Sequence, residues 1–179
     1  MYLLDIVSVT ATGYLFMIGQ AFLSSEVTED YAFVLQWLRD LYINAGLGLP
    51  LSVTTDQASG LLKALGEVFP EVPHLLCIWH VNKRVKAWVQ QHWLNKIVGN
   101  TVIQGEAEQT TPEQRAEYIA AKQERFWPLW CAIWSNARTE TDVEAAWQKL
   151  CGIYRAEYLK IISYLDTTWI KHRKLFCRF

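Results

Sequence analysis

The sequence predicts an α/β fold: a mixed sheet built from a hairpin and parallel strands, flanking helices, and a helical C-terminal half. Two runs of β-branched and aromatic residues flank Thr12-Gly13, a pair typical of turns, and therefore predict a hairpin. Two short apolar runs then alternate with helical patterns, as in domains with parallel strands. From Pro112 onward only helical patterns follow. The predicted strands are 2–10, 14–23, 51–55 and 74–79.

The predicted helices follow from apolar spacing and from start and stop signals. After Thr28, a good N-cap, apolar residues recur at i, i+3, i+4 and i+7 until Gly46. Phe69-Pro70 ends the next helix because proline cannot continue one. Pro112 suits a first helical turn. The remaining predictions are a helix over 57–68, a helix from His80 to about Val98, a loop over 100–109, a helix to Arg125, an interruption at Trp127-Pro128, and helix from about Thr141 to the end.

Length and composition limit the class of protein. A chain of 179 residues predicts one domain with room for an appendage, and 51% apolar residues exclude a disordered tail. The net charge of −1 gives no general attraction to nucleic acid, so DNA contacts require local basic segments. No apolar run approaches a membrane span, and the N-terminus does not resemble a signal peptide. The four cysteines match no disulfide framework and are expected to be reduced, intracellular thiols.

Asp56 is the first candidate for chemistry. It directly follows the predicted buried strand 51–55 and precedes a helix, at the edge of an α/β sheet where ligands bind. The competing interpretation is that Asp56 is the N-cap of that helix.

Three further residues have both a functional and a structural interpretation. Cys77 and His80 form a C-x-x-H pair, but a structural zinc site needs four ligands and no second pair stands at a suitable spacing. A buried thiol and a histidine at a helix entry are the simpler explanation. Glu144 ends a T-x-x-E pattern that begins at Thr141, so it is either a functional acid or part of a capping box.

Two segments carry only basic charges. Residues 72–105 and 167–179 contain no acidic residue, and each could contact phosphates or simply form a solvated face. The candidates for DNA contact are Lys83, Arg84 and Lys86 in the first segment, and Lys171, Arg173 and Lys174 in the second.

These pieces occur in the order seen in one family. The run from Leu3 to Gly13 resembles the "PLL-x-I-V-G-V-T-x-T-G" hairpin of Mutator-like element (MULE) transposases. Asp56 followed by "FP" and by the H-x-x-C-x-W-H pattern of residues 74–80 is specific for that family. The resemblance is strong over 1–98, weakens over 99–138, and returns at Val143–Leu150, which looks like "FE-x-x-W-x-x-L".

The resemblance implies an RNase H-like fold and a DDE catalytic triad that holds Mg²⁺ or Mn²⁺ for cleavage and transfer of DNA strands. Asp56 matches the second acid, and Glu144 is the better match to the third, with Glu140 as the open alternative. Cys77 and His80 match the family's C-x-x-H element. DNA is the implied partner, in the nucleus or cytoplasm; a homo-oligomer stays open, and neither a membrane nor a small-molecule cofactor is implied.

One departure changes the expected activity. The family's first acid lies in a "D-x-T-Y-x-x-N" strand ahead of the hairpin, and this pattern is absent here; Asp5 matches a non-catalytic position. We therefore expect a truncated, inactive copy that lacks the first strand, or alternatively a non-catalytic module that binds DNA or protein. The expected organisation is a partial core over 1–98, a helical insertion over 99–138, and C-terminal helices over 139–179 that complete the core.

Overall fold

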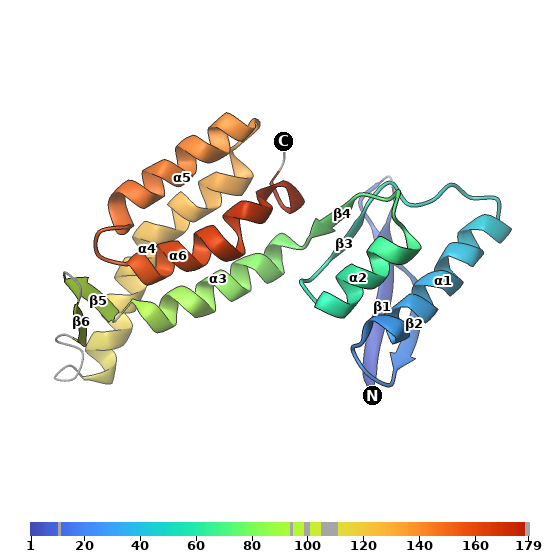
Figure 1. The fold of residues 1–179 in the computed structure, drawn as a ribbon, viewed down its shortest axis with the longest axis horizontal. Coiled ribbons are helices and arrows are strands. Elements are labelled where there is room, and N and C mark those ends of the chain that lie inside the picture. Colours follow the sequence, from blue (N-terminus) through green and yellow to red (C-terminus); the bar gives the residue numbers. More distant parts are fainter. Residues whose placement is uncertain (11, 94, 99–100, 105–110, 178–179) are drawn as a thin grey trace. The chain divides into compact units, whose positions relative to one another are not determined.

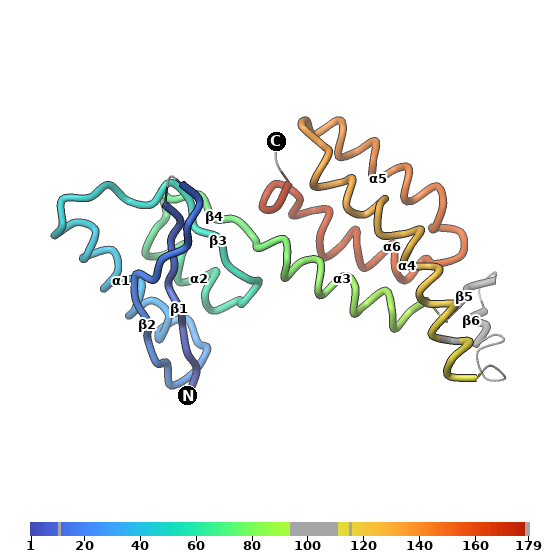
Figure 2. The backbone as a smooth tube through the Cα atoms, turned by 180° about the vertical axis from the view of Figure 1, so that it is seen from behind, coloured from blue at the N-terminus to red at the C-terminus, as the bar shows by residue number. Residues whose placement is uncertain are grey.

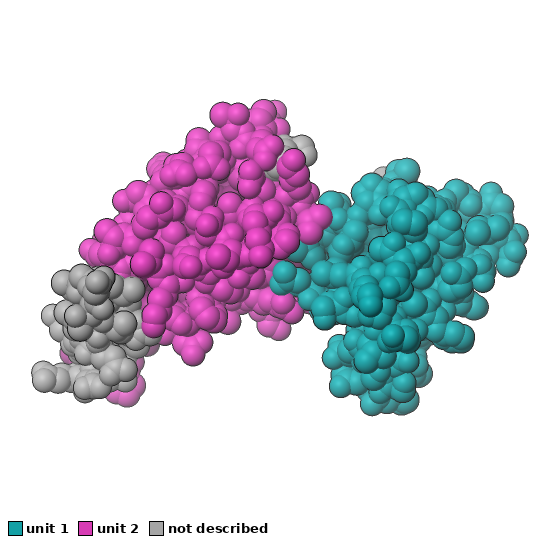
Figure 3. Space-filling model, viewed as in Figure 1, with its two compact units in different colours: residues 1–76 teal, residues 77–179 magenta. Residues whose placement is uncertain are grey.

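The computed structural model describes residues 1–10, 12–93, 95–98, 101–104 and 111–177. It consists of two compact units, Met1–Leu76 and Cys77–Phe179 (Figure 3). Each unit has its own set of buried apolar side chains. The four cysteines are free thiols.

A hairpin of two antiparallel strands opens the first unit and confirms the sequence-based prediction. β1 is Tyr2–Val9 and β2 is Leu15–Leu23. Gly13, between them, has a φ of 85°, a left-handed conformation that glycine adopts without steric cost. Along β1, half-buried side chains such as Leu4 and Ile6 alternate with exposed ones, so one face of the hairpin packs against the core.

Two helices supply the rest of that core. α1 is Thr28–Asn44 and α2 is Ser59–Val68, and their apolar stripes pack together and against the hairpin (Figure 1). Ala64 is completely buried in this core, and Leu65 and Phe69 are nearly so. As predicted, α2 ends just before Phe69-Pro70.

A close contact fixes the start of α2. A Cβ atom added to Gly60 would lie 2.5 Å from the carbonyl oxygen of Glu26 and 3.2 Å from the carbonyl carbon of Val27. Only glycine allows the backbone of α2 to approach the segment before α1 so closely. Glu26 is thereby held beside the N-terminal turn of α2.

Two short parallel strands complete the first unit. β3 (Val53–Thr55) and β4 (His74–Leu76) are paired, with Val53 opposite His74 and Thr55 opposite Leu76, and α2 is the crossover between them. Among the described residues, β1 pairs only with β2 and β3 only with β4. The predicted mixed sheet is therefore present as two separate two-stranded sheets, and an α/β class with a helical majority is what the structure supports.

The second unit is mainly helical, and its helices lie side by side in both views (Figures 1 and 2). Aromatic side chains from several helices form its core: Trp93 contacts Phe126, Tyr154 and Tyr158 with ring centroids 5.1–5.7 Å apart. The helices are α3 (Ile78–His92), α4 (Pro112–Ser135), α5 (Glu140–Tyr154), α6 (Leu159–Thr168) and a 3₁₀ helix (Ile170–Leu175).

The helix predicted from His80 to Val98 is too long. α3 ends at His92, and β5 (Asn95–Val98) pairs with β6 (Thr101–Gln104), which replaces part of the predicted loop. Both short segments are rich in Ile, Val and Thr, whose β-branched side chains favour strands over helix.

The interruption predicted at Trp127-Pro128 is also wrong. α4 continues through Pro128 to Ser135. Phe126 and Trp130, on either side of the proline, are completely buried, and their burial offsets the lost backbone hydrogen bond. The N-terminus of α4 is as predicted: Pro112 occupies the first turn, and Thr111 and Gln114 form a capping box.

Candidate functional site

Asp56 directly follows β3, at the carboxyl end of the parallel pair. Its Oδ1 accepts a hydrogen bond from the backbone N–H of Ala58 at 3.1 Å. Ala58, not Asp56, is the N-cap of α2, and no side chain caps this helix. The capping interpretation of Asp56 is therefore wrong, because the helix begins two residues later than the sequence suggested. The carboxylate instead forms an Asx turn at the end of the strand.

The neighbouring side chains fix the strand ends around Asp56. The Thr55 hydroxyl donates to the carbonyl oxygen of Asp56 at 2.8 Å and lies 2.8 Å from Nε2 of His74. Since the single hydroxyl proton is used on Asp56, Nε2 of His74 is the donor to Thr55. Burial lowers the pKa of His74, which keeps its ring neutral. This bridge between β3 and β4 holds the backbone of Asp56 in place.

A second carboxylate, Glu26, lies close to the same region. The hydroxyl of Tyr31, a side chain that is only 5% exposed, donates a long hydrogen bond of 3.5 Å to Oε1 of Glu26. The pKa of Tyr31 is raised by burial, then by the negative charges of Glu26 and Asp56. Both carboxylates thus act on the pKa of Tyr31, which the sequence reasoning did not anticipate. The usable signal was Gly60, whose lack of a side chain permits the close approach of Glu26.

Cys77 and His80 occupy the first turn of α3. Cys77 is the N-cap residue, with extended backbone and no capping hydrogen bond from its side chain. Nδ1 of His80 is buried and has no hydrogen-bond partner among the residues that the structure describes. The ring of Trp79 packs edge-on against that of His80, with centroids 4.7 Å apart. The predicted helix-entry position of this histidine is confirmed, and its part in a C-x-x-H element stays a prediction.

Glu144 is an exposed residue within α5 and does not cap that helix. The capping box is formed by Thr139 and Asp142, two residues earlier than the predicted pair at Thr141 and Glu144. Thr139 accepts from the N–H of Asp142, and Asp142 accepts from the N–H of Thr139 at 2.9 Å. Glu144 instead accepts a hydrogen bond of 2.7 Å from the Gln148 side chain, one turn later. Asp56 belongs to the first unit and Glu144 to the second, and their pairing stays a prediction.

Glu140, the alternative third acid, forms ion pairs with two basic side chains. Its Oε1 lies 2.7 Å from the Arg173 guanidinium, and its Oε2 lies 3.8 Å from Nζ of Lys174. Two cations therefore compete with any metal ion for this carboxylate. Glu144, the acid that the sequence motif favours, accepts instead from the neutral side chain of Gln148.

The basic residues of α3 form one exposed surface. Lys83, Arg84 and Lys86 are all exposed, while Val81, Val85 and Val89 on the other side of the helix are buried. Nζ of Lys83 lies 5.0 Å from the ring centroid of the exposed Trp79, a cation–π contact.

The C-terminal basic segment is less available for a partner. Arg173 is half-buried and binds both Glu140 and the carbonyl oxygen of Ile170. Lys171 and Lys174 are exposed, and Lys174 faces Glu140. Of the two predicted DNA-binding segments, α3 therefore presents more exposed basic side chains than the C-terminal segment does.

The candidate metal ligands are of the chemical type that Mg²⁺ or Mn²⁺ binds, but too few of them come together in the described residues. Carboxylate oxygens are the hard ligands these ions prefer. Within the part of the chain that the structure describes, no three His, Cys, Asp or Glu side chains come together as a metal site. We therefore derive no catalytic step through a metal ion. In the same described residues, no helix is both long and apolar enough to cross a membrane.

These observations define the first unit as an α/β domain that carries an acidic residue at the carboxyl edge of its parallel strands. Residues 1–84 match the family model of the MULE transposase domain. The match supports a Mutator-like transposase domain in this part of the chain, as its motifs indicated, and it covers Asp56, Cys77 and His80. No curated protein matches the chain.

Proposed function

We propose that the chain carries the RNase H-like core of a Mutator-like DDE transposase, and that it binds DNA without cleaving it. The observation that carries this proposal is the family match over residues 1–84, in which Asp56 directly follows the parallel strand β3. From the same match we also infer that the partner is DNA and that the protein is located in the nucleus.

In this proposal Asp56 is a ligand for Mg²⁺ or Mn²⁺, and Glu144 supplies a second carboxylate. The Asx turn uses Oδ1 of Asp56 on Ala58. The bridge from His74 to Thr55 prevents the end of β3 from shifting, so Asp56 is presented in a fixed position.

Cleavage is expected to fail because a two-metal centre needs more carboxylates than these. The sequence contains no D-x-T-Y pattern to provide the family's first acid. A misplacement of about 1 Å at such a centre costs on the order of 10²-fold in rate, and an incompletely bound ion costs more.

DNA contact is assigned to the exposed basic surface of α3. Lys83, Arg84 and Lys86 project from one side of a helix whose opposite side is buried. Each phosphate neutralised by a basic side chain releases counterions, so binding should weaken steeply as salt increases.

The test combines binding and cleavage on the same protein. Fluorescence anisotropy with a labelled duplex should show salt-dependent binding that is at least about tenfold weaker in a Lys83→Ala, Lys86→Ala double variant. A Lys63→Ala, Lys149→Ala variant, with the same loss of charge elsewhere, is the control and should bind normally. Plasmid nicking with Mg²⁺ or Mn²⁺ should stay at background. Unchanged binding in the α3 variant would contradict the assigned surface, and metal-dependent nicking that Asp56→Ala abolishes would contradict the claim of inactivity.

A further inference from the structure

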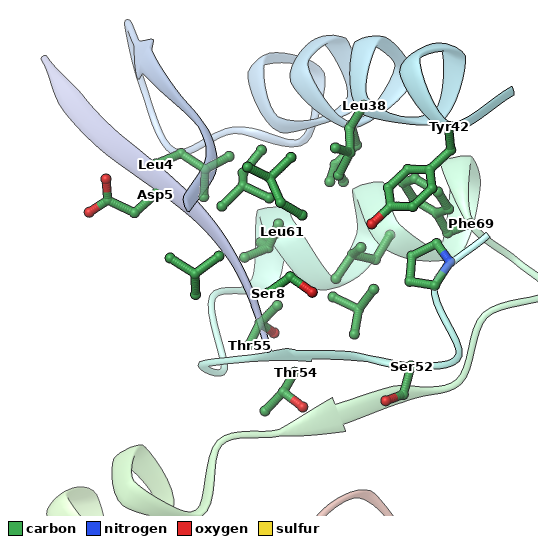
Figure 4. A pocket seen from close by; sticks show the side chains of 17 residues that line it. Leu4, Asp5, Ser8, Leu38, Tyr42, Ser52, Thr54, Thr55, Leu61 and Phe69 are labelled. Atoms are coloured by element: carbon green, nitrogen blue, oxygen red, sulfur yellow. The ribbon is translucent and has the colours of Figure 1, made fainter. Parts of the chain in front are cut away.

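The cavities of the two units differ in chemistry. In the first unit, the cavity drawn in Figure 4 is lined mainly by apolar side chains, and Asp5 is the one charged residue among the described residues that line it. In the second unit, a cleft of about 380 Å³ is lined by Glu140 and by the consecutive residues 171–175 of the 3₁₀ helix. Three of these residues, Lys171, Arg173 and Lys174, are cations, so the chemistry of this cleft suits an anion.

One carboxylate of the chain already occupies the anion position in this cleft. Nη2 of Arg173 donates to Oε1 of Glu140 at 2.7 Å, and Nζ of Lys174 lies 3.8 Å from Oε2. Two oxygens of a phosphate group can make the same pair of contacts. The side chain of Glu140 is 49% exposed and that of Arg173 is 25% exposed. Solvent therefore screens this ion pair, and a competing anion can displace the carboxylate at little cost in stability.

The cations of the 3₁₀ helix remain in position when Glu140 moves away. Nη1 of Arg173 also donates to the carbonyl oxygen of Ile170 at 3.2 Å, a contact that does not involve Glu140. Lys171 is exposed, and among the residues that the structure describes no carboxylate lies within ion-pair distance of it. Lys171 and Arg173 also line a neighbouring cleft of about 480 Å³ that contains Glu144.

We propose that the 3₁₀ helix is a second surface for the phosphate groups of DNA, and that Glu140 masks this surface until DNA displaces its carboxylate. The inference rests on the proposed function, which supplies DNA as the polyanion. On binding, phosphate oxygens take the place of Oε1 and Oε2 at Arg173 and Lys174, and Lys171 contacts a further phosphate. Release of counterions from the DNA favours this exchange. A strand bound here would also lie beside Glu144, because Lys171 and Arg173 line both clefts.

Glu140→Gln tests the masking, because it removes the charge and keeps the size of the side chain. In fluorescence anisotropy with a labelled duplex, the variant should bind at least about threefold more tightly than the unmodified chain, and the slope of log K against log salt should steepen by about 1–2, since one or two more cations contact phosphates. Glu124→Gln is the matched control: it removes the same charge from an exposed position of α4 and should change neither quantity.

Two further measurements assign the effect to the 3₁₀ helix. In a Lys171→Ala, Lys174→Ala background, Glu140→Gln should no longer tighten binding, because the unmasked cations are absent. In the unmodified chain, Nε of Arg173 is buried and has no partner among the described residues. Its N–H signal in nuclear magnetic resonance should shift when the duplex is added, which reports the displacement of Glu140 even if the variant does not fold.

The outcomes separate this inference from the proposed function. If neither the unmodified chain nor any variant binds the duplex, the proposed function fails and this inference fails with it. If the unmodified chain binds but Glu140→Gln leaves the affinity and the salt slope unchanged, this inference alone is overturned. It is likewise overturned if the tightening persists in the Lys171→Ala, Lys174→Ala background, or if the Arg173 signal does not move when the duplex is bound.

Discussion

Single residues around Asp56 fix the backbone at the carboxyl ends of the two parallel strands and at the start of α2. The Thr55–His74 bridge, the Asx turn of Asp56 and the missing side chain of Gly60 each fix one piece of backbone at the ends of β3, β4 and α2. Sequence reasoning identified Asp56 but not its surroundings, because contacts such as that of Thr55 with His74 depend on tertiary packing and leave no local pattern.

His74 should make the stability of the first unit sensitive to pH. Its pKa is lowered in the folded state by burial, below the ordinary value of about 6.5. The unfolded chain then binds more protons in this interval, so the stabilisation is complete above about pH 6.5 and is lost as the pH falls through the lowered pKa. The free energy of unfolding, measured by urea denaturation, should decrease from pH 7 to pH 5.

His74→Gln is the control for this prediction, because its amide can still donate to Thr55 but does not titrate. The variant should show a flatter dependence over the same interval. Equal slopes for the two proteins would assign the pH effect to other groups.

Gly60 and Gly66 offer a matched pair within α2. Gly60→Ala should destabilise the protein by about 1–3 kcal/mol because the new methyl group would overlap the backbone of Glu26 and Val27. At Gly66 a Cβ meets nothing within 4 Å, so Gly66→Ala should stabilise the helix by about 0.5–1 kcal/mol. Thermal unfolding followed by circular dichroism measures both. A neutral Gly60→Ala would show that α2 is not held against the segment before α1.

At the scale of elements, apolar periodicity predicted most helices, and runs of β-branched residues predicted the four strands of the first unit. The predicted N-caps Thr28, Asp56 and Thr141 are wrong, because the helices begin after Val27, Ala58 and Thr139. The errors fall where local signals compete. Pro128 lies inside α4 because two buried aromatic side chains anchor the helix on either side of it. α3 is shorter than predicted because the β-branched residues of 95–98 pair with 101–104, a contact that helical periodicity does not reveal.

The start of α5 provides a direct test at this scale. Thr139 and Asp142 form the capping box, so Thr139→Ala should cost about 1 kcal/mol of stability. Thr141→Ala, inside the first turn, should change stability by less than about 0.5 kcal/mol. Chemical denaturation of the two variants distinguishes the observed cap from the one that the Thr141–Glu144 pattern suggested, and the reverse order of effects would contradict the structure.

At the scale of the whole molecule, the family was predictable and the completed site was not. The hairpin motif, Asp56 and the C-x-x-H element lie within residues 1–84, the segment that matches the family model. Glu144 lies beyond that match and in the other compact unit, so its role and the three-part domain division remain predictions. Residues far apart in the sequence have no local spacing that shows whether they come together, so sequence reasoning could name Asp56 and Glu144 but not their geometry.

The central claim is that Asp56 is a ligand for a divalent ion in a transposase-type core. The most direct measurement is titration of the purified chain with Mn²⁺, with free Mn²⁺ followed by electron paramagnetic resonance. Asp56→Asn should weaken binding at least about tenfold, since a neutral amide replaces a charged oxygen ligand. Asp5→Asn, on the hairpin, should bind Mn²⁺ as the unmodified chain does. Equal Mn²⁺ affinity for Asp56→Asn and the unmodified chain, or loss of binding in Asp5→Asn instead, would contradict the account.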